Sequence, residues 1–368
     1  MTLKIFEPIK IGKMELRNRI MRSATWDGTA DRSGATTELS TSIYRKLAEG
    51  GIGLIVTGYA FISSNGQAVS GQYGIHNDNM IPGWKQIVKA VHNSGGKIAM
   101  QIVHAGANSG YLSSKGIALS AVSSLPEMTK VHTEMTEEDI ESIISDFAAA
   151  GIRVREAGFD AVQLHGAHGY LMSQFVSPLY NHRSDRWGGN SENRRRFHLE
   201  VIRRLRKVIG NDYPILIKFG VQDDRDSGLP LEEGVEIARQ MERSGIDSIE
   251  ISSGVGTSAS ITDAKGLEPV FRERAAAVKR TVSVPVAVVS GIRQLDIAKQ
   301  IIDSGDADII SMSRPFIREP DIVLQWQKGK STIAKCISCN RCFSVLRRGE
   351  GLDCGEERRL REENSDKI

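Results

Sequence analysis

Residues 156–164 read EAGFDAVQL, and two later stretches repeat the same order of residue types, RSGIDSIEI at 243–251 and DSGDADIIS at 303–311. Each stretch runs from a helical pattern through a glycine and an aspartate into a run of apolar residues. The glycine suits the left-handed residue that ends a helix, and the aspartate suits a short turn from helix to strand. The three stretches therefore indicate a repeated unit in which a strand closely follows a helix.

Short apolar runs recur along the whole chain, and longer segments with helical periodicity separate them. Runs that are apolar at nearly every position are typical of strands buried on both faces of a parallel sheet. The predicted strands are residues 19–24, 53–60, 97–103, 160–166, 214–220, 247–253, 284–291 and 306–313. The predicted helices are residues 39–50, 79–94, 136–157, 194–209, 231–244, 269–281, 294–304 and 316–328.

This alternation predicts an α/β fold of the (β/α)8 TIM barrel type. A doubly wound sheet is the alternative. It is disfavoured because the chain lacks a G-x-G-x-x-G motif, and SGVGTS (253–258) supplies only G-x-G without a convincing helix after it.

The composition is that of an ordinary globular protein, because apolar residues make up 40% of the 368 residues and charged residues 25%. Disordered and fibrous classes are therefore excluded. The formal net charge of +3 is too small to indicate a surface for nucleic acid or membrane. The N-terminal residues have no apolar signal-peptide core, and no later stretch is long and apolar enough to span a membrane, so we expect a cytoplasmic protein.

The barrel pattern ends near residue 330, which predicts a barrel over residues 1–330 and an extension over 331–368. The final stretch, GEERRLREENSDKI (355–368), is expected to be a solvated charged tail. All cysteines of the chain lie in this extension, and in a reducing compartment such a group indicates metal binding rather than disulfides. The cysteines are Cys336, Cys339, Cys342 and Cys354.

The cysteine spacing is C-x2-C-x2-C-x11-C. Its first three cysteines match the tight loop with which bacterial ferredoxins turn thiolates toward an iron–sulfur cluster, and a remote cysteine completes the set. Structural zinc sites more often contain two separated C-x2-C pairs, although tetrahedral thiolates also suit zinc. The spacing favours a 4Fe–4S cluster and leaves zinc as the alternative.

Two histidines and a tyrosine stand where the fourth predicted strand ends. His165 closes the strand, and His168 and Tyr170 follow in the next loop. Active sites of TIM barrels lie at this end of the strands. Two neutral imidazoles can donate hydrogen bonds to a carbonyl or nitro oxygen, and a phenol can deliver a proton. A single histidine would more often be structural, but the H-x-x-H-x-Y grouping favours catalysis. A metal site is disfavoured because the loop supplies no further ligand.

Other polar residues also stand at predicted strand ends. Gln101 ends strand three, with a donor and an acceptor on one amide edge that suit a heterocycle, although a buried glutamine is often only a packing partner. Lys218 ends strand five, where a salt bridge inside the barrel is equally expected. Gly291 and Arg314 follow strands seven and eight, which often form a phosphate site. These residues predict a cofactor that carries a phosphate.

The stretches HGAHGYLMSQFVSPLYNHRSDRWGG (165–189) and SENRRRF (191–197) resemble the old yellow enzyme family of FMN-dependent oxidoreductases, and the similarity runs from about residue 3 to about residue 330. The stretch DADIISMSRPF (306–316) followed by CISCNRC (336–342) is similar to the branch containing 2,4-dienoyl-CoA reductase and trimethylamine dehydrogenase. Members of that branch carry an iron–sulfur cluster after the barrel. Their second and third cysteines are usually one residue further apart in the reductase.

The resemblance implies a role for each candidate residue. Ser23, Ala24 and Ala60 would line the isoalloxazine ring, Gln101 would bind its pyrimidine edge, and Lys218 would lie beside N1 and O2. Gly291 and Arg314 would hold the phosphate, with Ser313 as a further cofactor contact. His165 and His168 would anchor the substrate, and Tyr170 would donate the proton. Trp26 stands where the family commonly has cysteine, threonine or histidine near the flavin. Lys218 replaces the more usual arginine.

We therefore expect an FMN enzyme that NADH, NADPH or a separate electron-donor protein reduces, and whose flavin N5 passes a hydride to an activated alkene of the enone or enoate type. An amine dehydrogenase of the same branch and an electron-relay flavoprotein subunit are the alternatives. An FMN barrel acting on RNA is less favoured, because the run Arg194–Arg196 fits a solvated helix face and every cysteine lies in the extension. We expect a small-molecule substrate, no nucleic-acid or membrane partner, and leave a homo-oligomer open.

Overall fold

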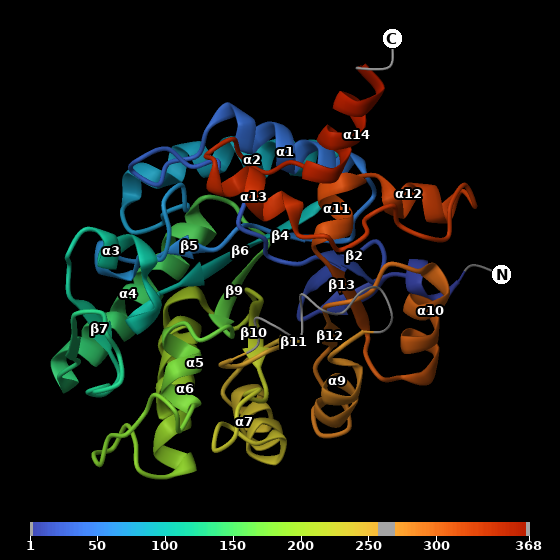
Figure 1. Cartoon of the computed structure of the whole chain (residues 1–368). Helices are drawn as coiled ribbons and strands as arrows, with labels where there is room; N and C mark the ends of the chain where they lie inside the picture. The colour runs from blue at the N-terminus through green and yellow to red at the C-terminus, as the bar shows by residue number, and fades with distance from the viewer. Residues whose placement is uncertain (1–2, 257–268, 366–368) are drawn as a thin grey trace.

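The computed structural model describes residues 3–256 and 269–365 of the chain (Figure 1). Parallel strands form a closed barrel, because β13 pairs with β3 on one side and β4 pairs with both β3 and β6 on the other. The barrel strands are β3 (Ile20–Arg22), β4 (Leu54–Val56), β6 (Lys97–Val103), β9 (Ala161–Gly166), β10 (Ile215–Gly220), β11 (Ser248–Ser252), β12 (Val286–Val288) and β13 (Ile309–Met312). The (β/α)8 TIM barrel predicted from the sequence is confirmed.

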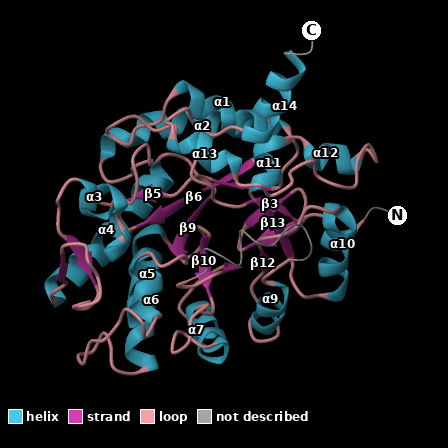
Figure 2. Ribbon diagram, viewed as in Figure 1, coloured by secondary structure: helices cyan, strands magenta, loops and turns pink. Residues whose placement is uncertain are grey.

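Helices surround the strands, as Figure 2 shows. The outer helices are α1 (Glu38–Glu49), α2 (Ile81–Asn93), α4 (Glu137–Glu156), α6 (Ser191–Ile209), α7 (Leu231–Arg243), α9 (Arg272–Lys279), α10 (Leu295–Ser304), α11 (Arg314–Arg318) and α12 (Ile322–Gln327). The helix predicted over 316–328 is divided into α11 and α12. Pro320 lies between them, and proline cannot donate the backbone hydrogen bond that a continuous helix needs there. Among the described residues, no helix is both long and apolar enough to cross a membrane.

The repeated stretches join neighbouring strands at the N-terminal end of the barrel. Asp160 Oδ2 accepts a hydrogen bond from Ile98 N at 2.9 Å, so the aspartate before β9 binds the start of β6. Asp247 binds Ile215 N at 2.8 Å and Asp308 binds Val286 N at 2.9 Å in the same way. A cation pairs with each carboxylate: Lys97, Arg206 and Lys279 lie 2.8, 2.7 and 2.9 Å away, respectively. The internal repeat in the sequence is therefore a repeated strand-to-strand contact.

Side chains that point into the barrel change from apolar to polar along the strands. Near the N-terminal end the interior holds Met21, Leu54, Val56, Ala99, Ala161, Leu216, Ala287 and Ile309. A hairpin of β1 (Ile9–Ile11) and β2 (Met14–Leu16), which the sequence patterns did not reveal, places Ile11, Met14 and Leu16 against this cluster. The hairpin closes the end of the barrel away from the expected active site.

Further elements connect the barrel units. They are the strands β5 (Ala60–Phe61), β7 (Leu119–Ala121) and β8 (His132–Glu134), the helices α3 (Gly110–Ser114) and α5 (Leu171–Val176), and the 3-10 helices η1 (Lys4–Phe6), η2 (Ser64–Gly66), η3 (Asp78–Met80) and η4 (Gly106–Asn108). The last two residues of the SGVGTS stretch lie outside the described residues.

The C-terminal extension forms α13 (Arg341–Arg347) and α14 (Gly355–Ser365). Residues 355–365 form the helix α14, in which Glu356 is buried and pairs with Arg341 and Arg359, whereas residues 361–365 are exposed, and the solvated tail stays a prediction. Glu357 also pairs with Arg318 of α11 at 3.0 Å, which fixes α14 to the barrel. In Figure 1, α13 lies across the top of the barrel and α14 projects beyond it. The division at residue 330 stays a prediction.

Candidate active site

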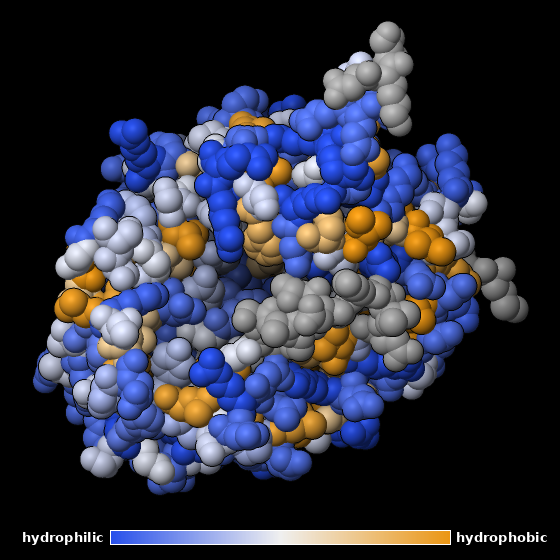
Figure 3. Space-filling model, viewed as in Figure 1, coloured by the Kyte–Doolittle hydropathy of each residue, from blue (hydrophilic) through white to orange (hydrophobic). Residues whose placement is uncertain are grey.

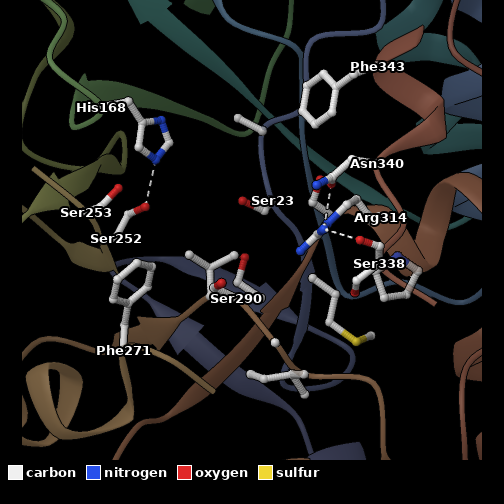
Figure 4. A pocket seen from close by; sticks show the side chains of 18 of the residues that line it. Ser23, His168, Ser252, Ser253, Phe271, Ser290, Arg314, Ser338, Asn340 and Phe343 are labelled. Atoms are coloured by element: carbon white, nitrogen blue, oxygen red, sulfur yellow. Dashed lines mark hydrogen bonds between the residues drawn. The ribbon is translucent and has the colours of Figure 1, made fainter. Parts of the chain in front are cut away.

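A cavity of about 860 Å³ lies at the C-terminal end of the barrel strands. Its wall is formed by residues after β3, at the ends of β10, β11, β12 and β13, and on α13 of the extension. Figure 3 shows the surface hollowed near the centre of this face, and Figure 4 shows the cavity from close by. The predicted residues on its wall are Ser23, Ala24, His168, Lys218, Gly291, Ser313 and Arg314.

The two predicted histidines and the tyrosine lie together. The rings of His165 and His168 are 5.1 Å apart at 89°, and the Tyr170 ring lies 5.0 Å from His165. Sequence reasoning missed Tyr59, which follows β4; its hydroxyl lies 3.3 Å from that of Tyr170, and its ring lies 5.9 Å from His165. Tyr59 is the next-to-last residue of the strand predicted over 53–60, so the search of strand ends could have found it.

His168 has a backbone conformation that is uncommon for a residue with a side chain, because its φ is +60°. Two contacts with the end of β11 hold it there. Its backbone N donates to Ser253 O at 3.0 Å, and its Nε2 lies 2.8 Å from Ser252 Oγ, as the dashed line in Figure 4 marks. Backbone strain of this kind is concentrated at functional sites.

Both histidines are neutral at pH 7. Burial, followed by the nearby His168 and Lys218, lowers the pKa of His165 well below its usual value. Desolvation, followed by the charge of Lys218, lowers the pKa of His168 to about 3. Burial raises the pKa of Tyr170, with the Tyr59 hydrogen bond opposing it, so its phenol keeps its proton. The three side chains can therefore donate hydrogen bonds without carrying charge.

A polar network crosses the barrel beneath the cavity. Gln101 Nε2 donates to Gln163 Oε1 at 2.7 Å, and Gln163 Nε2 donates to Glu250 Oε2 at 3.0 Å. Glu250 Oε1 lies 3.4 Å from Lys218 Nζ, and Lys218 also donates to Ser23 Oγ at 2.6 Å. The predicted residues Gln101, Lys218 and Ser23 are thus joined through two residues that the sequence analysis missed, Gln163 and Glu250.

A signal for Gln163 and Glu250 was present in the sequence. Each stands two residues after another inward position, Ala161 and Ser248 respectively, and side chains alternate between the two faces of a strand. The search for polar residues at strand ends passed over them because they lie within the strands.

The predicted phosphate end of the cavity lies between β12, β13 and the extension. Ser290 and Gly291 both have positive φ, +84° and +78°, and the Ser290 hydroxyl is buried with no hydrogen-bond partner among the described residues. Arg314 Nη1 donates to Asn340 Oδ1 at 2.8 Å and lies 3.4 Å from Ser338 O (Figure 4). Ser313 Oγ lies 2.7 Å from Thr25 Oγ1.

The other predicted residues are not among the described residues that line the cavity. Gln101 and His165 are buried in the strands beneath it, and Ala60 is buried in β5. Tyr170 follows His168 at the start of α5. Trp26 lies against Gly28, which in turn adjoins Leu346 of α13.

The four cysteines line one small pocket of about 20 Å³ between α11, α13 and α14. Burial raises the pKa of Cys336, and it raises that of Cys342 to about 11. Within residues 3–256 and 269–365, no group of three or more Cys, His, Asp or Glu side chains is arranged to hold a metal ion. The segment from Ser338 to Arg341 lines both this pocket and the large cavity, so one loop separates the two.

Comparison with known proteins places these features in a family. An NADH oxidase of Thermoanaerobacter brockii is 35% identical, with 93% of this chain and 54% of the oxidase covered, so the chain spans about half the length of that relative. An NADPH dehydrogenase of Bacillus subtilis is 32% identical, with 87% of this chain and 93% of the dehydrogenase covered. A 2-naphthoyl-CoA reductase structure superposes with a TM-score of 0.90 at 27% identity, over 95% of this chain and 56% of the reductase.

The family match extends over residues 4–332, which include every barrel strand and the cavity wall up to α12. The resemblance to old yellow enzyme noted in the sequence is thereby confirmed. The chain belongs to the NADH:flavin oxidoreductase / NADH oxidase family, whose members are FMN-dependent oxidoreductases.

Proposed function

We propose that this chain binds FMN in the large cavity and reduces the activated carbon–carbon double bond of a small molecule, with NADH, NADPH or a separate electron-donor protein as the reductant. The observation that carries the proposal is the geometry of His165 and His168, whose rings lie 5.1 Å apart, with the Tyr170 ring 5.0 Å from His165. The likeness to 2-naphthoyl-CoA reductase is consistent with it.

The cavity fits FMN by its size and by its chemistry. Ligand pockets occupy about 300–1,000 Å³, and this cavity lies within that range. Lys218 and Arg314 provide positive charge on its wall, as a ring with a polar edge and a phosphate require. Successive backbone N–H groups in loops with positive φ can converge on an anion, and Ser290 with Gly291 provides such a loop.

Bound FMN supplies the hydride. The protein supplies the hydrogen bonds and the proton. Ala167 N donates to His165 Nδ1 at 3.4 Å, so the His165 proton resides on Nε2. His165 and His168 would donate to the substrate oxygen on which negative charge develops, and Tyr170 would protonate the α-carbon.

We propose that Ser252 selects the tautomer of His168. The Ser252 hydroxyl lies 2.8 Å from His168 Nε2. When this hydroxyl donates, Nε2 is the acceptor and the proton of the neutral ring resides on Nδ1. His168 then donates from Nδ1, while its Nε2 remains bound to β11.

Purified protein reconstituted with FMN is expected to bind one FMN per chain, because the proposed contacts come from several strand ends that meet only in the folded barrel. Absorbance and released flavin measure the stoichiometry. Anaerobic assays with 2-cyclohexen-1-one, with NADH or NADPH as reductant, then test the reaction. Protein that takes up no FMN contradicts the cofactor, and FMN-loaded protein that oxidises an amine but reduces no enone favours the amine dehydrogenase.

We also propose that the cysteines bind a 4Fe–4S cluster. The four thiols line one pocket, and their chemistry suits iron–sulfur ligation, although they are not arranged around a common metal position in this structure. Ser338 and Asn340 have φ of +57° and +60°, a backbone form found in loops that surround iron–sulfur clusters. A cluster here would be one loop away from the FMN cavity and could pass single electrons to it.

Anaerobic purification is expected to give about four iron and four sulfide per chain, as a 4Fe–4S cluster requires. Iron and acid-labile sulfide analysis measures both. Cys342→Ser is expected to lose the cluster and keep FMN, whereas Thr332→Ala, at an exposed position of the extension that lines neither pocket, should keep both. Stoichiometric zinc in place of iron contradicts the cluster.

A further inference from the structure

Glu250 is a buried carboxylate that belongs to no residue group predicted from the sequence. It lies within β11, its side chain is 1% exposed, and residues from four other parts of the barrel bind it. Ser23 Oγ and Ser311 Oγ donate to its Oε1 at 2.8 and 2.7 Å, and Gln163 Nε2 donates to its Oε2 at 3.0 Å. A buried ionised carboxylate needs such donors and a cation to offset the loss of water.

The cation is Lys218. Its side chain is 3% exposed, and its Nζ lies 3.4 Å from Glu250 Oε1 and 2.6 Å from Ser23 Oγ. Burial lowers the pKa of Lys218, Glu250 opposes that change, and Arg22 adds to it. His165 and His168 are also close, but they are neutral. Glu250 is thus the acidic group that favours the charged form of Lys218.

Lys218 reaches the cavity and Glu250 does not. Lys218, Ser23 and Ser311 are on the cavity wall, whereas Glu250 is behind them. The carboxylate therefore holds three groups that face the proposed flavin, while it touches neither flavin nor substrate. This arrangement is that of a positioning residue.

We infer that Glu250 keeps Lys218 protonated and aimed at the flavin, and thereby sets the relative affinity of this site for reduced and oxidised FMN. The inference rests on the proposed binding of FMN in this cavity. A fixed positive charge near the ring stabilises the negative charge of reduced flavin, so it raises the midpoint potential.

The test is the midpoint potential of bound FMN between pH 6 and pH 9, measured by anaerobic titration of the holoprotein and of Glu250→Gln. With glutamine at this position, buried Lys218 has lost its acidic partner and should release its proton within this range. The potential of the variant relative to wild type should therefore fall as the pH rises. A shift of about 30 mV corresponds to a tenfold change in relative affinity for a two-electron couple.

Two further variants separate this role from a merely structural one. Ser311→Ala removes one hydrogen bond to the same carboxylate and no charge, so its potential should run parallel to wild type at all pH values. Lys218→Met combined with Glu250→Gln removes both charges. The midpoint potential of this double variant should lie below that of wild type from pH 6 to pH 9, and the difference should not change with pH. This double variant also provides the test if Glu250→Gln does not fold, since an unchanged potential in it would overturn the inference.

The outcomes distinguish this inference from the proposed function. Wild-type protein that binds no FMN refutes the proposed function. If wild-type protein binds FMN but the midpoint potential of Glu250→Gln runs parallel to that of wild type at every pH, only the inference about Glu250 is refuted. The same pH-dependent step in Ser311→Ala would also refute it, because that variant leaves the charge in place.

Discussion

Replacing His165 and His168 together by alanine is expected to abolish enone reduction and to leave FMN bound. The two rings are perpendicular at 5.1 Å and are proposed to donate to the substrate oxygen. Removing one such donor typically lowers kcat by roughly 10²–10³-fold, or about 2.7–4 kcal/mol. The measurements are steady-state turnover of 2-cyclohexen-1-one and flavin content. Each single variant should be impaired by about that factor.

The matched control is His182→Ala, since His182 is exposed and is not on the described cavity wall. Its turnover should equal that of wild type. Tyr170→Phe should slow the oxidation of reduced enzyme by enone and leave its reduction by NADH or NADPH unchanged. A double histidine variant that turns over within twofold of wild type contradicts the assignment.

Acid is expected to destabilise the protein through two buried histidines outside the proposed chemistry. Burial lowers the pKa of His198 to about 3 and that of His104 to about 4. Both nitrogens of His198 and the Nε2 of His104 are buried without partners among the described residues. These two histidines take up protons near pH 6.5 in the unfolded chain but not in the folded protein, so the free energy of unfolding decreases as the pH falls below 6.5. By pH 4 each histidine should lower the free energy of unfolding by about 3 kcal/mol.

His198→Phe should remove its share of this acid sensitivity, because His198 packs edge-on against Phe219 at 5.9 Å in a site that suits an aromatic ring. Urea unfolding at pH 7.5 and pH 4.5, at equal flavin content, measures the difference. His182→Phe, at an exposed position, should keep the wild-type dependence. Equal loss of stability on acidification in His198→Phe and wild type would argue against this source.

The barrel was predictable because buried parallel strands leave long apolar runs, and the aspartates of the repeated stretches occupy the same place in three units. The hairpin β1–β2 was not, since its strands of three residues are too short to show a period. The helix α14 was missed because its sequence is charged throughout, and ion pairs such as Arg318 with Glu357 hold it in place of an apolar face.

The candidate site was predictable only where chemistry coincides with a strand end, as for His165 and Lys218. Alternation along the strand marks Glu250 as an inward position, but its role depends on residues that are distant in sequence: Ser23 is 227 positions away, and Ser311 is 61. No local pattern encodes which side chains converge on one carboxylate at the barrel axis. The contact of Arg314 with Asn340 was likewise hidden, because it joins the barrel to the extension.

That contact joins the thiol loop directly to the wall of the large cavity. Arg293 Nη1 donates to Cys336 O at 2.7 Å, and Arg314 Nη1 donates to Asn340 Oδ1. Both arginines also form the cavity wall. Any movement of this loop therefore displaces two guanidinium groups of the cavity wall. Because linkage is reciprocal, whatever factor an occupant of the thiol pocket would impose on the affinity of the cavity for an anion, the anion would impose on the affinity of the thiol pocket.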